Sequence, residues 1–364
     1  MNSTAVSIID LNAITHNLKL IRELMPNQKI LAMIKSDAYG HGLIPVAKAI
    51  HAADALGVAT IAEAAQLINA DVKNDIIVMR GFTTADELAV FFNHSNLIAC
   101  IHDLNQLPLL EKAYYPNQKM RIWLKVDSGM HRLGIQADAF QSVYQRLNQL
   151  PCIEKEFVVC SHLADADNAD LTFTQQQIQA FNHMTKNISN KKSLLNSAGI
   201  IAHPQAHDDW IRPGLMLYGV SPFDYPGKHD VIMKNFIPAM TFESKLISVK
   251  NIQAGDKVGY SCTYTAEHAM KIGIVGMGYG DSYPRHAKNG TPVLIRGQRC
   301  PIVGRVSMDM ITVDVSHVKD VAVDDTVILW GRDLLVSEIA HCVNTVPHEL
   351  LCHLTGRVQR KYLS

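Results

Sequence analysis

The stretch "ALGVATIAEAAQLINADVKNDIIVMRGFTTADELAVFFNHSNLIACI", residues 55–101, decides the fold class. In it, short apolar runs alternate with segments whose apolar residues recur at helical spacing. The apolar runs are 55–60, 75–80 and 96–101, and the helical segments are 61–70 and 84–94. Nearly continuous apolar strands that alternate with helices are typical of parallel sheet, because helices cover both of its faces. We therefore predict a parallel α/β architecture.

The same alternation continues on both sides of this stretch. Further strands are predicted at 29–34, 121–126, 156–162 and 192–199, a last strand and turn at 211–219, and further helices at 11–24, 43–53 and 172–186. A threonine cap is expected at the start of the last helix. About eight repeats over roughly 230 residues favour a (β/α)8 barrel of the TIM type over an open doubly wound sheet.

The sequence changes in character after about residue 236. From 237 onward, short β segments are separated by glycine, proline and aspartate turns, and a short helical pattern and a basic tail follow them. We therefore predict two domains. The barrel would occupy residues 1–236, and a mostly β domain would occupy residues 237–364.

The composition excludes several classes of protein. The 364 residues include 34 basic and 34 acidic side chains, so neither nucleic acid nor an anionic membrane is an expected partner. No apolar run reaches about 18 residues, and the start of the chain does not resemble a signal peptide. The seven cysteines are dispersed without a CxxC pair. We expect a cytoplasmic protein with reduced thiols and no metal site.

Several polar side chains share one position, directly after an apolar strand. They are Lys35, Arg80, Lys125, His162, Ser197 and Arg212. The carboxyl ends of barrel strands meet at one face, where barrel enzymes place their chemistry. A lysine at a strand end usually extends to solvent, but Lys35 would point into the mouth of the barrel. A desolvated lysine has a lowered pKa and readily forms a Schiff base.

Eight segments, in chain order, resemble those of bacterial alanine racemases, a family of fold-type III enzymes that use pyridoxal 5'-phosphate (PLP). They are "AMIKSDAYGHG" (32–42), "LKVDSGMHRLG" (124–134), "CSHLADAD" (160–167), "NSAG" (196–199), "IRPGLMLYG" (211–219), "VGYSCTYTA" (258–266), "GYGDSYPR" (278–285) and "GRVSMDM" (304–310). The resemblance runs from residue 4 to the C-terminus. It implies interconversion of L- and D-alanine by two-base proton transfer on the external aldimine of PLP and substrate, and a supply of D-alanine for peptidoglycan.

The resemblance implies a set of cofactor-binding residues. Lys35 would form the Schiff base with PLP and, once substrate displaces it, would act as a base on one face of the substrate Cα. Tyr39 would donate its hydroxyl to the phosphate. Ser197 and the backbone N–H groups of Gly214 and Leu215 would hold the other phosphate oxygens.

A second group of implied residues serves the proton transfer. Arg212 would face the pyridine nitrogen of PLP and leave it unprotonated, because arginine keeps its own proton at this pH. Tyr260 would be the base on the other face of Cα, and His162 would contact both Tyr260 and Arg212. In this family that tyrosine reaches the barrel of the partner subunit, so the resemblance implies a homodimer with shared active sites.

The substrate carboxylate also has implied partners. Arg132 would contact it together with the phenolic oxygen of PLP, and the backbone N–H of Met308 would hold it from the partner chain. Lys125 matches a lysine that is often carbamylated in the family. A carbamate there would hold Arg132 in place, whereas an unmodified Lys125 would repel it.

The resemblance extends to the entryway of the site, with one departure. Residues that would line or support it are Asp167, Tyr279, Arg305 and Asp309. In "VPHELLC" (346–352), His348 stands where the family usually has a tyrosine that closes the mouth of the site. Because imidazole is shorter than phenol, the resemblance leaves substrate selectivity open.

Three alternatives to a strict alanine racemase follow from these residues. A PLP racemase with broader specificity or a preference for serine would use the same two bases and differ only in the pocket, above all at His348. A PLP carrier without turnover would lack a β domain with Tyr260. A fold-related PLP decarboxylase generally has an acid opposite the pyridine nitrogen, where this chain has Arg212. An alanine racemase is the favoured interpretation.

Overall fold

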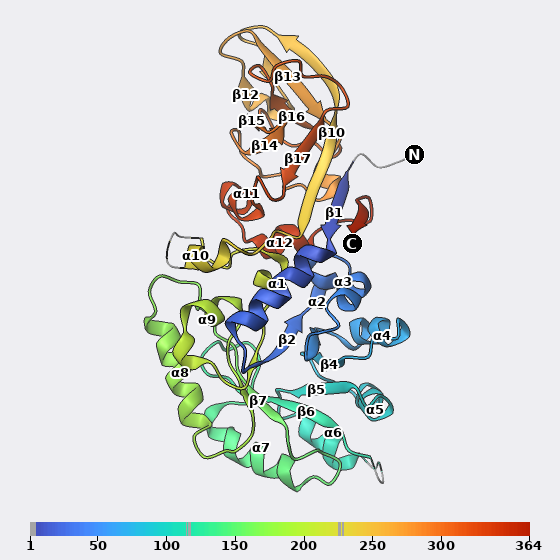
Figure 1. The fold of residues 1–364 in the computed structure, drawn as a ribbon, viewed down its shortest axis with the longest axis vertical. Helices are drawn as coiled ribbons and strands as arrows, with labels where there is room; N and C mark the ends of the chain where they lie inside the picture. Colours follow the sequence, from blue (N-terminus) through green and yellow to red (C-terminus); the bar gives the residue numbers. More distant parts are fainter. Residues whose placement is uncertain (1–4, 114, 116–117, 225–226, 228) are drawn as a thin grey trace.

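The computed structural model describes residues 5–113, 115, 118–224, 227 and 229–364. These residues form two eight-stranded sheets and one two-stranded sheet. The first eight-stranded sheet forms the barrel in the lower half of Figure 1, and the second forms the core of a β domain above it.

All neighbouring strands of the barrel sheet are parallel, in the order β8-β7-β6-β5-β4-β3-β2-β9. They are β2 (Lys29–Met33), β3 (Ala55–Val58), β4 (Asp75–Val78), β5 (Leu97–Ile101), β6 (Arg121–Lys125), β7 (Val158–Cys160), β8 (Lys192–Ser193) and β9 (Trp210–Ile211). The two outer strands meet, since the Ser193 hydroxyl donates to the carbonyl oxygen of Trp210 at 3.0 Å. The sheet is therefore a nearly closed barrel, which confirms the predicted fold class.

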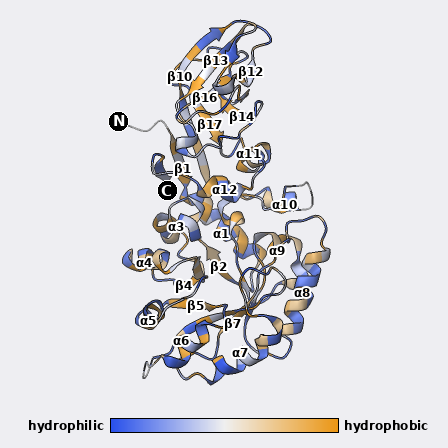
Figure 2. Ribbon diagram, turned by 180° about the vertical axis from the view of Figure 1, so that it is seen from behind, coloured by the Kyte–Doolittle hydropathy of each residue, from blue (hydrophilic) through white to orange (hydrophobic). Residues whose placement is uncertain are grey.

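Helices surround this barrel. They are α1 (Leu11–Leu24), α2 (Lys35–Tyr39), α3 (Leu43–Ala49), α4 (Ile61–Asn69), α5 (Ala85–Asn93), α6 (Gln106–Lys112), α7 (Ala137–Gln149), α8 (Thr172–Met184), α9 (Ser197–Ala202) and α10 (His229–Met233). Every residue of β5 is buried, as expected for a strand with its own helices on one face and the barrel interior on the other. Figure 2 shows hydrophobic colour on the barrel strands, whereas the surrounding helices carry both hydrophobic and hydrophilic colours.

Local sequence signals explain where these helices begin. Thr60 caps α4, because its hydroxyl accepts the Glu63 N–H and the Glu63 carboxylate reaches back to the N–H of Thr60. The predicted threonine cap of α8 is wrong: Leu171 occupies the cap position and makes no side-chain cap bond, since Thr172 is already helical. The predicted last strand and turn at 211–219 are both present, but the strand is short and ends at Ile211.

After Ile211 the segment 211–219 leaves the sheet and forms a 3-10 turn, η2 (Leu215–Tyr218). Pro213 interrupts the strand, because proline has no N–H for the ladder. The turn places the backbone of Gly214 and Leu215 at the mouth of the barrel.

The second sheet joins strands from both ends of the chain. Its strands are β1 (Val6–Asp10), β10 (Met240–Ile252), β13 (Met270–Val275), β14 (Pro292–Ile295), β15 (Gln298–Pro301), β16 (Ile311–Asp314), β17 (Thr326–Trp330) and β18 (Gln359–Leu363). β1 pairs antiparallel with β10 and parallel with β18, so the strand before the barrel belongs to the second sheet. A mostly β second domain is thereby confirmed, while the division into residues 1–236 and 237–364 stays a prediction.

Short elements complete the β domain. They are β11 (Lys257–Val258), β12 (Tyr264–Thr265), η3 (Tyr260–Cys262), η4 (Tyr279–Asp281), α11 (Val336–Cys342) and α12 (Pro347–Cys352). α12 contacts α2, which lies at the mouth of the barrel.

None of the helices in the described ranges combines the length and apolar character that a membrane crossing requires. All seven cysteines are free thiols.

Candidate active site

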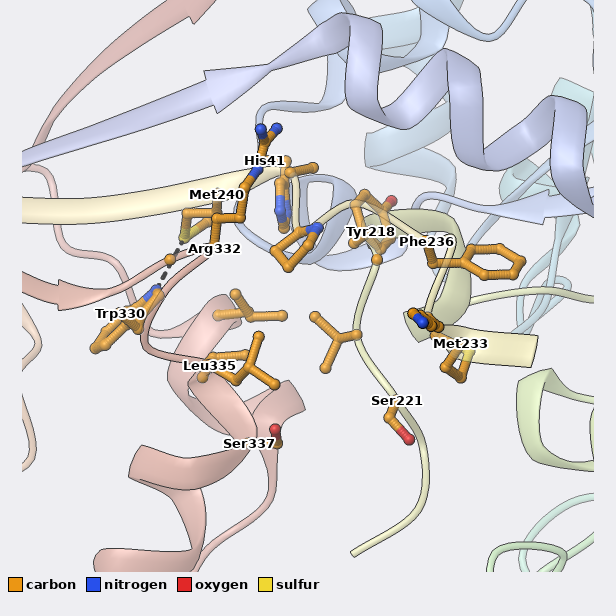
Figure 3. Close-up of a pocket in the computed structure, with 18 of the residues that line it drawn as sticks. His41, Tyr218, Ser221, Met233, Phe236, Met240, Trp330, Arg332, Leu335 and Ser337 are labelled. Atoms are coloured by element: carbon orange, nitrogen blue, oxygen red, sulfur yellow. Dashed lines mark hydrogen bonds between the residues drawn. The ribbon is translucent and has the colours of Figure 1, made fainter. Parts of the chain in front are cut away.

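Among the cavities formed by the described residues, two bear on the site. One, of about 370 Å³, separates the barrel from the second sheet, and its walls carry apolar side chains such as Met233, Met240, Trp330 and Leu335 (Figure 3). None of the residues implied by the resemblance lines it. The other, of about 590 Å³, lies at the carboxyl ends of the barrel strands. Its lining includes Lys35, Tyr39, Lys125, Arg132, His162, Asp167, Ser197, Arg212, Gly214, Leu215 and His348.

Lys35 is followed by a turn in which the backbone adopts the left-handed helical conformation. Residues 36–39 all have φ values of 53–54°, and the Gly40 N–H donates to the carbonyl oxygen of Ser36 at 3.1 Å, as in a left-handed helical turn. Each L-residue in that conformation costs roughly 1–2 kcal/mol, so the four together cost on the order of 4–8 kcal/mol. Such strain persists only where the surrounding structure enforces it. Lys35 and Tyr39, at the two ends of the turn, both reach the cavity.

The cavity concentrates cationic groups. Burial, followed by the charges of Arg132 and Lys125, lowers the pKa of the Lys35 amine. Burial also lowers the pKa of Lys125, and Arg212 and Arg132 contribute to that shift. A lowered lysine pKa increases the fraction of neutral amine at neutral pH, and the neutral amine is the form that acts as nucleophile or base.

Arg212 is buried and organises the floor of the cavity. Its guanidinium donates to the carbonyl oxygens of Ser193 at 2.9 Å and Leu194 at 2.9 Å, and to Nδ1 of His162 at 3.4 Å. Because arginine only donates, Nδ1 of His162 accepts. Burial and the charge of Arg212 hold the pKa of His162 well below its usual value, so the imidazole is neutral with its proton on Nε2.

Backbone and hydroxyl groups converge at another wall of the cavity. Ser197 begins α9, and its Oγ accepts the N–H groups of Gly214 at 2.8 Å and Met216 at 3.4 Å. A Cβ at Gly214 would lie 2.7 Å from the Tyr39 hydroxyl oxygen, so only glycine permits this approach. Burial raises the pKa of Tyr39, which keeps its hydroxyl protonated and able to donate. The hydroxyls of Tyr39 and Ser197 can each donate a hydrogen bond at this wall, and such a pair of donors suits an anion.

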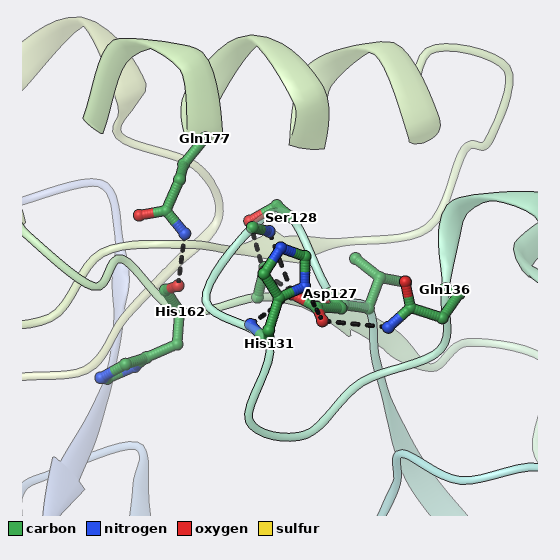
Figure 4. Close-up of polar contacts among 9 residues, drawn as sticks. Asp127, Ser128, His131, Gln136, His162 and Gln177 are labelled. Carbon is green, nitrogen blue, oxygen red and sulfur yellow. Dashed lines mark hydrogen bonds and ion pairs between the residues drawn. The ribbon is translucent and has the colours of Figure 1, made fainter. Parts of the chain in front are cut away.

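Arg132 lies on a loop that Asp127 organises (Figure 4). The Asp127 carboxylate accepts the N–H groups of Gly129 at 3.0 Å and His131 at 3.1 Å, and the side-chain amide of Gln136 at 3.1 Å. Burial acts to raise the pKa of Asp127, but these hydrogen bonds bring it below the usual value. The ionised carboxylate therefore fixes the loop that carries Arg132 into the cavity.

His348 and Asp167 occupy the wall and the mouth of the same cavity. The ring of His348, on α12, lies 5.7 Å from the ring of Tyr39. Burial and the charge of Lys35 lower the pKa of His348 to about 4, so its imidazole is neutral at neutral pH. Burial raises the pKa of Asp167.

Five implied residues lie elsewhere, on the β domain, and do not line this cavity within one chain. They are Tyr260, Tyr279, Arg305, Met308 and Asp309. Tyr260 and Met308 are 67% and 51% exposed, respectively. The N–H of Gly280 donates to the carbonyl oxygen of Met308 at 2.8 Å, which joins the segments of Tyr279 and Met308. The chain therefore carries its implied residues in two places, one in the barrel and one on an exposed face of the β domain.

Cys352 and Asn196 are among the cavity residues that were not expected from the sequence. Cys352 follows His348 by one helical turn of α12, so helical spacing places both on one face. Asn196 precedes Ser197 and caps α9 by accepting the Gly199 N–H at 3.0 Å. Both residues could have been found from the sequence. Cys352 follows His348 at i, i+4 spacing, and Asn196 stands directly before a short helix.

Comparison with known proteins agrees with this architecture. The family described as "Alanine racemase, N-terminal domain" matches residues 9–222, and "Alanine racemase, C-terminal domain" matches residues 239–362. An alanine racemase of Coxiella burnetii (strain RSA 331 / Henzerling II) is 47% identical over 357 residues, which cover 98% of each chain.

Solved structures agree as well. The biosynthetic alanine racemase of Pseudomonas aeruginosa superimposes with a TM-score of 0.94 at 38% identity, covering 100% of both chains. The alanine racemase of Bartonella henselae, solved with covalently bound pyridoxal phosphate, gives a TM-score of 0.88 at 29% identity and covers 99% of both chains. With both family domains matched over nearly the whole length, this chain belongs to the alanine racemase family.

Proposed function

We propose that this protein is a PLP-dependent alanine racemase that interconverts L- and D-alanine in the cytoplasm and supplies D-alanine for peptidoglycan. The observation that carries the proposal is the meeting of Lys35, with its lowered pKa, and the Tyr39 and Ser197 hydroxyls in one cavity at the carboxyl face of a barrel. Family membership and the covalently bound pyridoxal phosphate of the Bartonella henselae relative support it.

The described residues fit PLP at two points. The amine of Lys35 suits the aldehyde carbon, and the donors around Ser197, Gly214, Leu215 and Tyr39 suit the phosphate. When bound, PLP withdraws electrons from the substrate Cα and makes its α-hydrogen acidic. The buried, permanently charged Arg212 would face the ring nitrogen.

Proton transfer would use one base on each face of the substrate Cα. The neutral amine of Lys35 would take or return the proton on one face. Tyr260 would do so on the other face, aided by His162, which Arg212 holds in its neutral form. Because Tyr260 is exposed on the β domain and does not line its own chain's cavity, we propose that it enters the site of a partner subunit in a homodimer.

Substrate binding would draw on both subunits. Arg132 would bind the alanine carboxylate from the barrel, and the backbone N–H of Met308 would bind it from the partner. Asp167 would line the entryway of one chain, together with Tyr279, Arg305 and Asp309 of the other. In this proposal, residues 1–236 form the PLP-binding domain, and residues 237–364 complete the site of the partner.

The proposal is tested by incubating the purified protein and PLP with L-alanine or with L-serine and separating the products by chiral chromatography. D-alanine should accumulate until the two enantiomers are equal. Formation of D-serine in preference to D-alanine would establish the serine-preferring alternative instead. Failure to racemise either amino acid, with PLP bound, would refute the proposal.

Lys125 gives the first prediction. Its neutral amine is suited to attack CO2: the new C–N bond forms, the amine loses a proton, and the resulting carbamate would pair with Arg132. We expect Lys125→Ala to lower kcat/KM by roughly 10–100-fold, the size of a lost charge-assisted hydrogen bond of about 1.5–3 kcal/mol. Wild-type turnover should also slow in CO2-free buffer and recover on addition of bicarbonate. A Lys125→Ala enzyme with wild-type kinetics would remove this residue from the mechanism.

His348 gives the second prediction, and its position beside Tyr39 supports the broader-specificity alternative. Because imidazole fills less space than phenol, we expect His348→Tyr to raise the preference for alanine over serine by roughly tenfold, the effect of about one methylene-sized change in a pocket. The ratio of kcat/KM values measures it. The matched control is His353→Tyr, the same change at an exposed residue directly after α12. An unchanged ratio in the His348→Tyr enzyme would show that this wall does not select the substrate.

A further inference from the structure

Two carboxylates hold the left-handed turn at residues 36–39. Oε1 of Glu63 accepts the Ser36 N–H at 2.6 Å, and Asp37 joins the turn to two other segments. Oδ1 of Asp37 accepts the Leu43 N–H at 2.7 Å, which ties the turn to the start of α3. Oδ2 of Asp37 forms an ion pair with Nη1 of Arg360 at 2.7 Å. Arg360 lies in β18, the strand that pairs with β1 in the second sheet. The strained turn of the barrel is thus connected directly to the β domain.

The same C-terminal region encloses the turn on its other sides. A Cβ at Gly40 would lie 1.9 Å from the carbonyl oxygen of Leu351, and a Cβ at Gly42 would lie 2.1 Å from the hydroxyl oxygen of Tyr362. Both glycines also have positive φ values, of 79° and 95°. α12 and β18 therefore pack against the backbone that leads away from the turn, with no space for a side chain between them.

This arrangement matters because the turn links two cavity residues. Lys35 precedes it and Tyr39 ends it, so a change in the backbone between them would alter the direction of both side chains. Neither Asp37 nor Arg360 lines the cavity. The hydrogen bond and ion pair of these two residues therefore reach the cavity by way of the turn, where they can affect the direction of Lys35 and Tyr39.

We infer that Arg360 is a positioning residue: through Asp37 it holds the left-handed turn that directs Lys35 and Tyr39 into the cavity. The inference deepens the proposed function and rests on it for its catalytic part. An ion pair whose side chains are 30% and 47% exposed usually contributes little to the stability of a fold. The effect should therefore appear in the turn and in the reaction rather than in global unfolding.

The first measurement needs neither PLP nor activity. Hydrogen exchange of the peptide that contains residues 29–42 is compared between the cofactor-free wild type and Arg360→Glu, which places a like charge beside Asp37. Exchange of the turn should accelerate by roughly fivefold, since local opening frees its backbone hydrogen bonds. The matched control is Lys361→Glu, the same charge change at the next residue, whose side chain points to the opposite face of β18.

The second measurement follows the reaction. Arg360→Glu should lower kcat for alanine by roughly 100-fold, as expected for a misplaced reacting group, with KM changed by less than about threefold. Arg360→Lys should recover most of the loss, because it restores the charge. Asp37→Asn removes the charge but retains an oxygen for the Leu43 N–H, so it should reproduce a milder form of the defect even if Arg360→Glu folds poorly.

The outcomes separate this inference from the proposed function. If the wild type does not racemise alanine but exchange of the turn accelerates only in Arg360→Glu and Asp37→Asn, the proposed function fails and the role of Arg360 in the turn stands. If turn exchange in folded Arg360→Glu and Asp37→Asn matches the wild type, the inference is wrong. It is also wrong if Lys361→Glu has the same effects, since net charge alone would then be responsible.

Discussion

Replacing Lys35 by alanine is expected to remove the visible absorbance of lysine-bound PLP and to lower racemisation by roughly 10⁴-fold or more. A positioned base is worth about 10²–10⁴-fold, and the same substitution also removes the nucleophile that binds the cofactor. The Lys35 side chain projects into the cavity rather than into the core, so the variant should fold normally. Absorbance spectra and chiral chromatography measure the two effects.

The control for this variant is Lys29→Ala. Lys29 begins the strand β2 that Lys35 follows, but it is exposed at the opposite end of the barrel. Its replacement removes one lysine without touching the cavity, so absorbance and activity should remain. If the absorbance of lysine-bound PLP persisted in Lys35→Ala, another lysine would hold the cofactor and the assignment of Lys35 would fall.

The second large effect concerns Tyr260, and we expect it to differ between L-alanine and D-alanine. On the proposed mechanism, Tyr260→Phe would remove the base on one face of the substrate, while Lys35 would still serve the other. In the proposed mechanism Lys35 would face the α-hydrogen of D-alanine, so deuterium uptake from D2O should continue with D-alanine. With L-alanine it should fall by roughly 10²–10⁴-fold. Tyr264→Phe, the same change four residues further on in β12, should leave both directions unaffected. Equal losses with both enantiomers would contradict a two-base mechanism.

Mixing two inactive variants tests where Tyr260 acts. In a dimer of one Lys35→Ala chain and one Tyr260→Phe chain, one site combines the intact Lys35 of the second chain with the intact Tyr260 of the first. The other site lacks both. Random exchange of equal amounts makes about half of the dimers mixed, each with one intact site of two, so about a quarter of wild-type activity should return. No recovery, with subunit exchange demonstrated by mass spectrometry, would show that each chain uses its own tyrosine.

The barrel could be predicted from the sequence because its strands are buried on both faces. Segments such as 97–101 read as uninterrupted apolar runs, and the helices between them carry their own start signals, as at Thr60. β1 could not be assigned to the second sheet in the same way. Its residues Val6–Asp10 resemble a barrel strand, and its partners β10 and β18 lie far along the chain, so only the folded structure reveals the pairing.

The candidate site was predictable in part for similar reasons. Side chains that follow barrel strands, such as Lys125 and Arg212, meet at the carboxyl face because strand direction requires it. The left-handed conformation of the turn after Lys35 could not be predicted from the sequence. Serine, aspartate, alanine and tyrosine all prefer negative φ, and only packing against distant segments enforces the positive values. The exposed position of Tyr260 likewise depends on how the β domain folds, not on the local sequence.

The left-handed turn also constrains the order of events during synthesis on the ribosome. Lys35 and the strands of the barrel leave the ribosome early, whereas Leu351, Arg360 and Tyr362, which enclose the turn, leave it much later. A nascent chain can therefore form barrel strands long before the segment after Lys35 has the contacts that impose its shape. Formation of the turn is therefore a late step, because it requires the segments around Leu351, Arg360 and Tyr362.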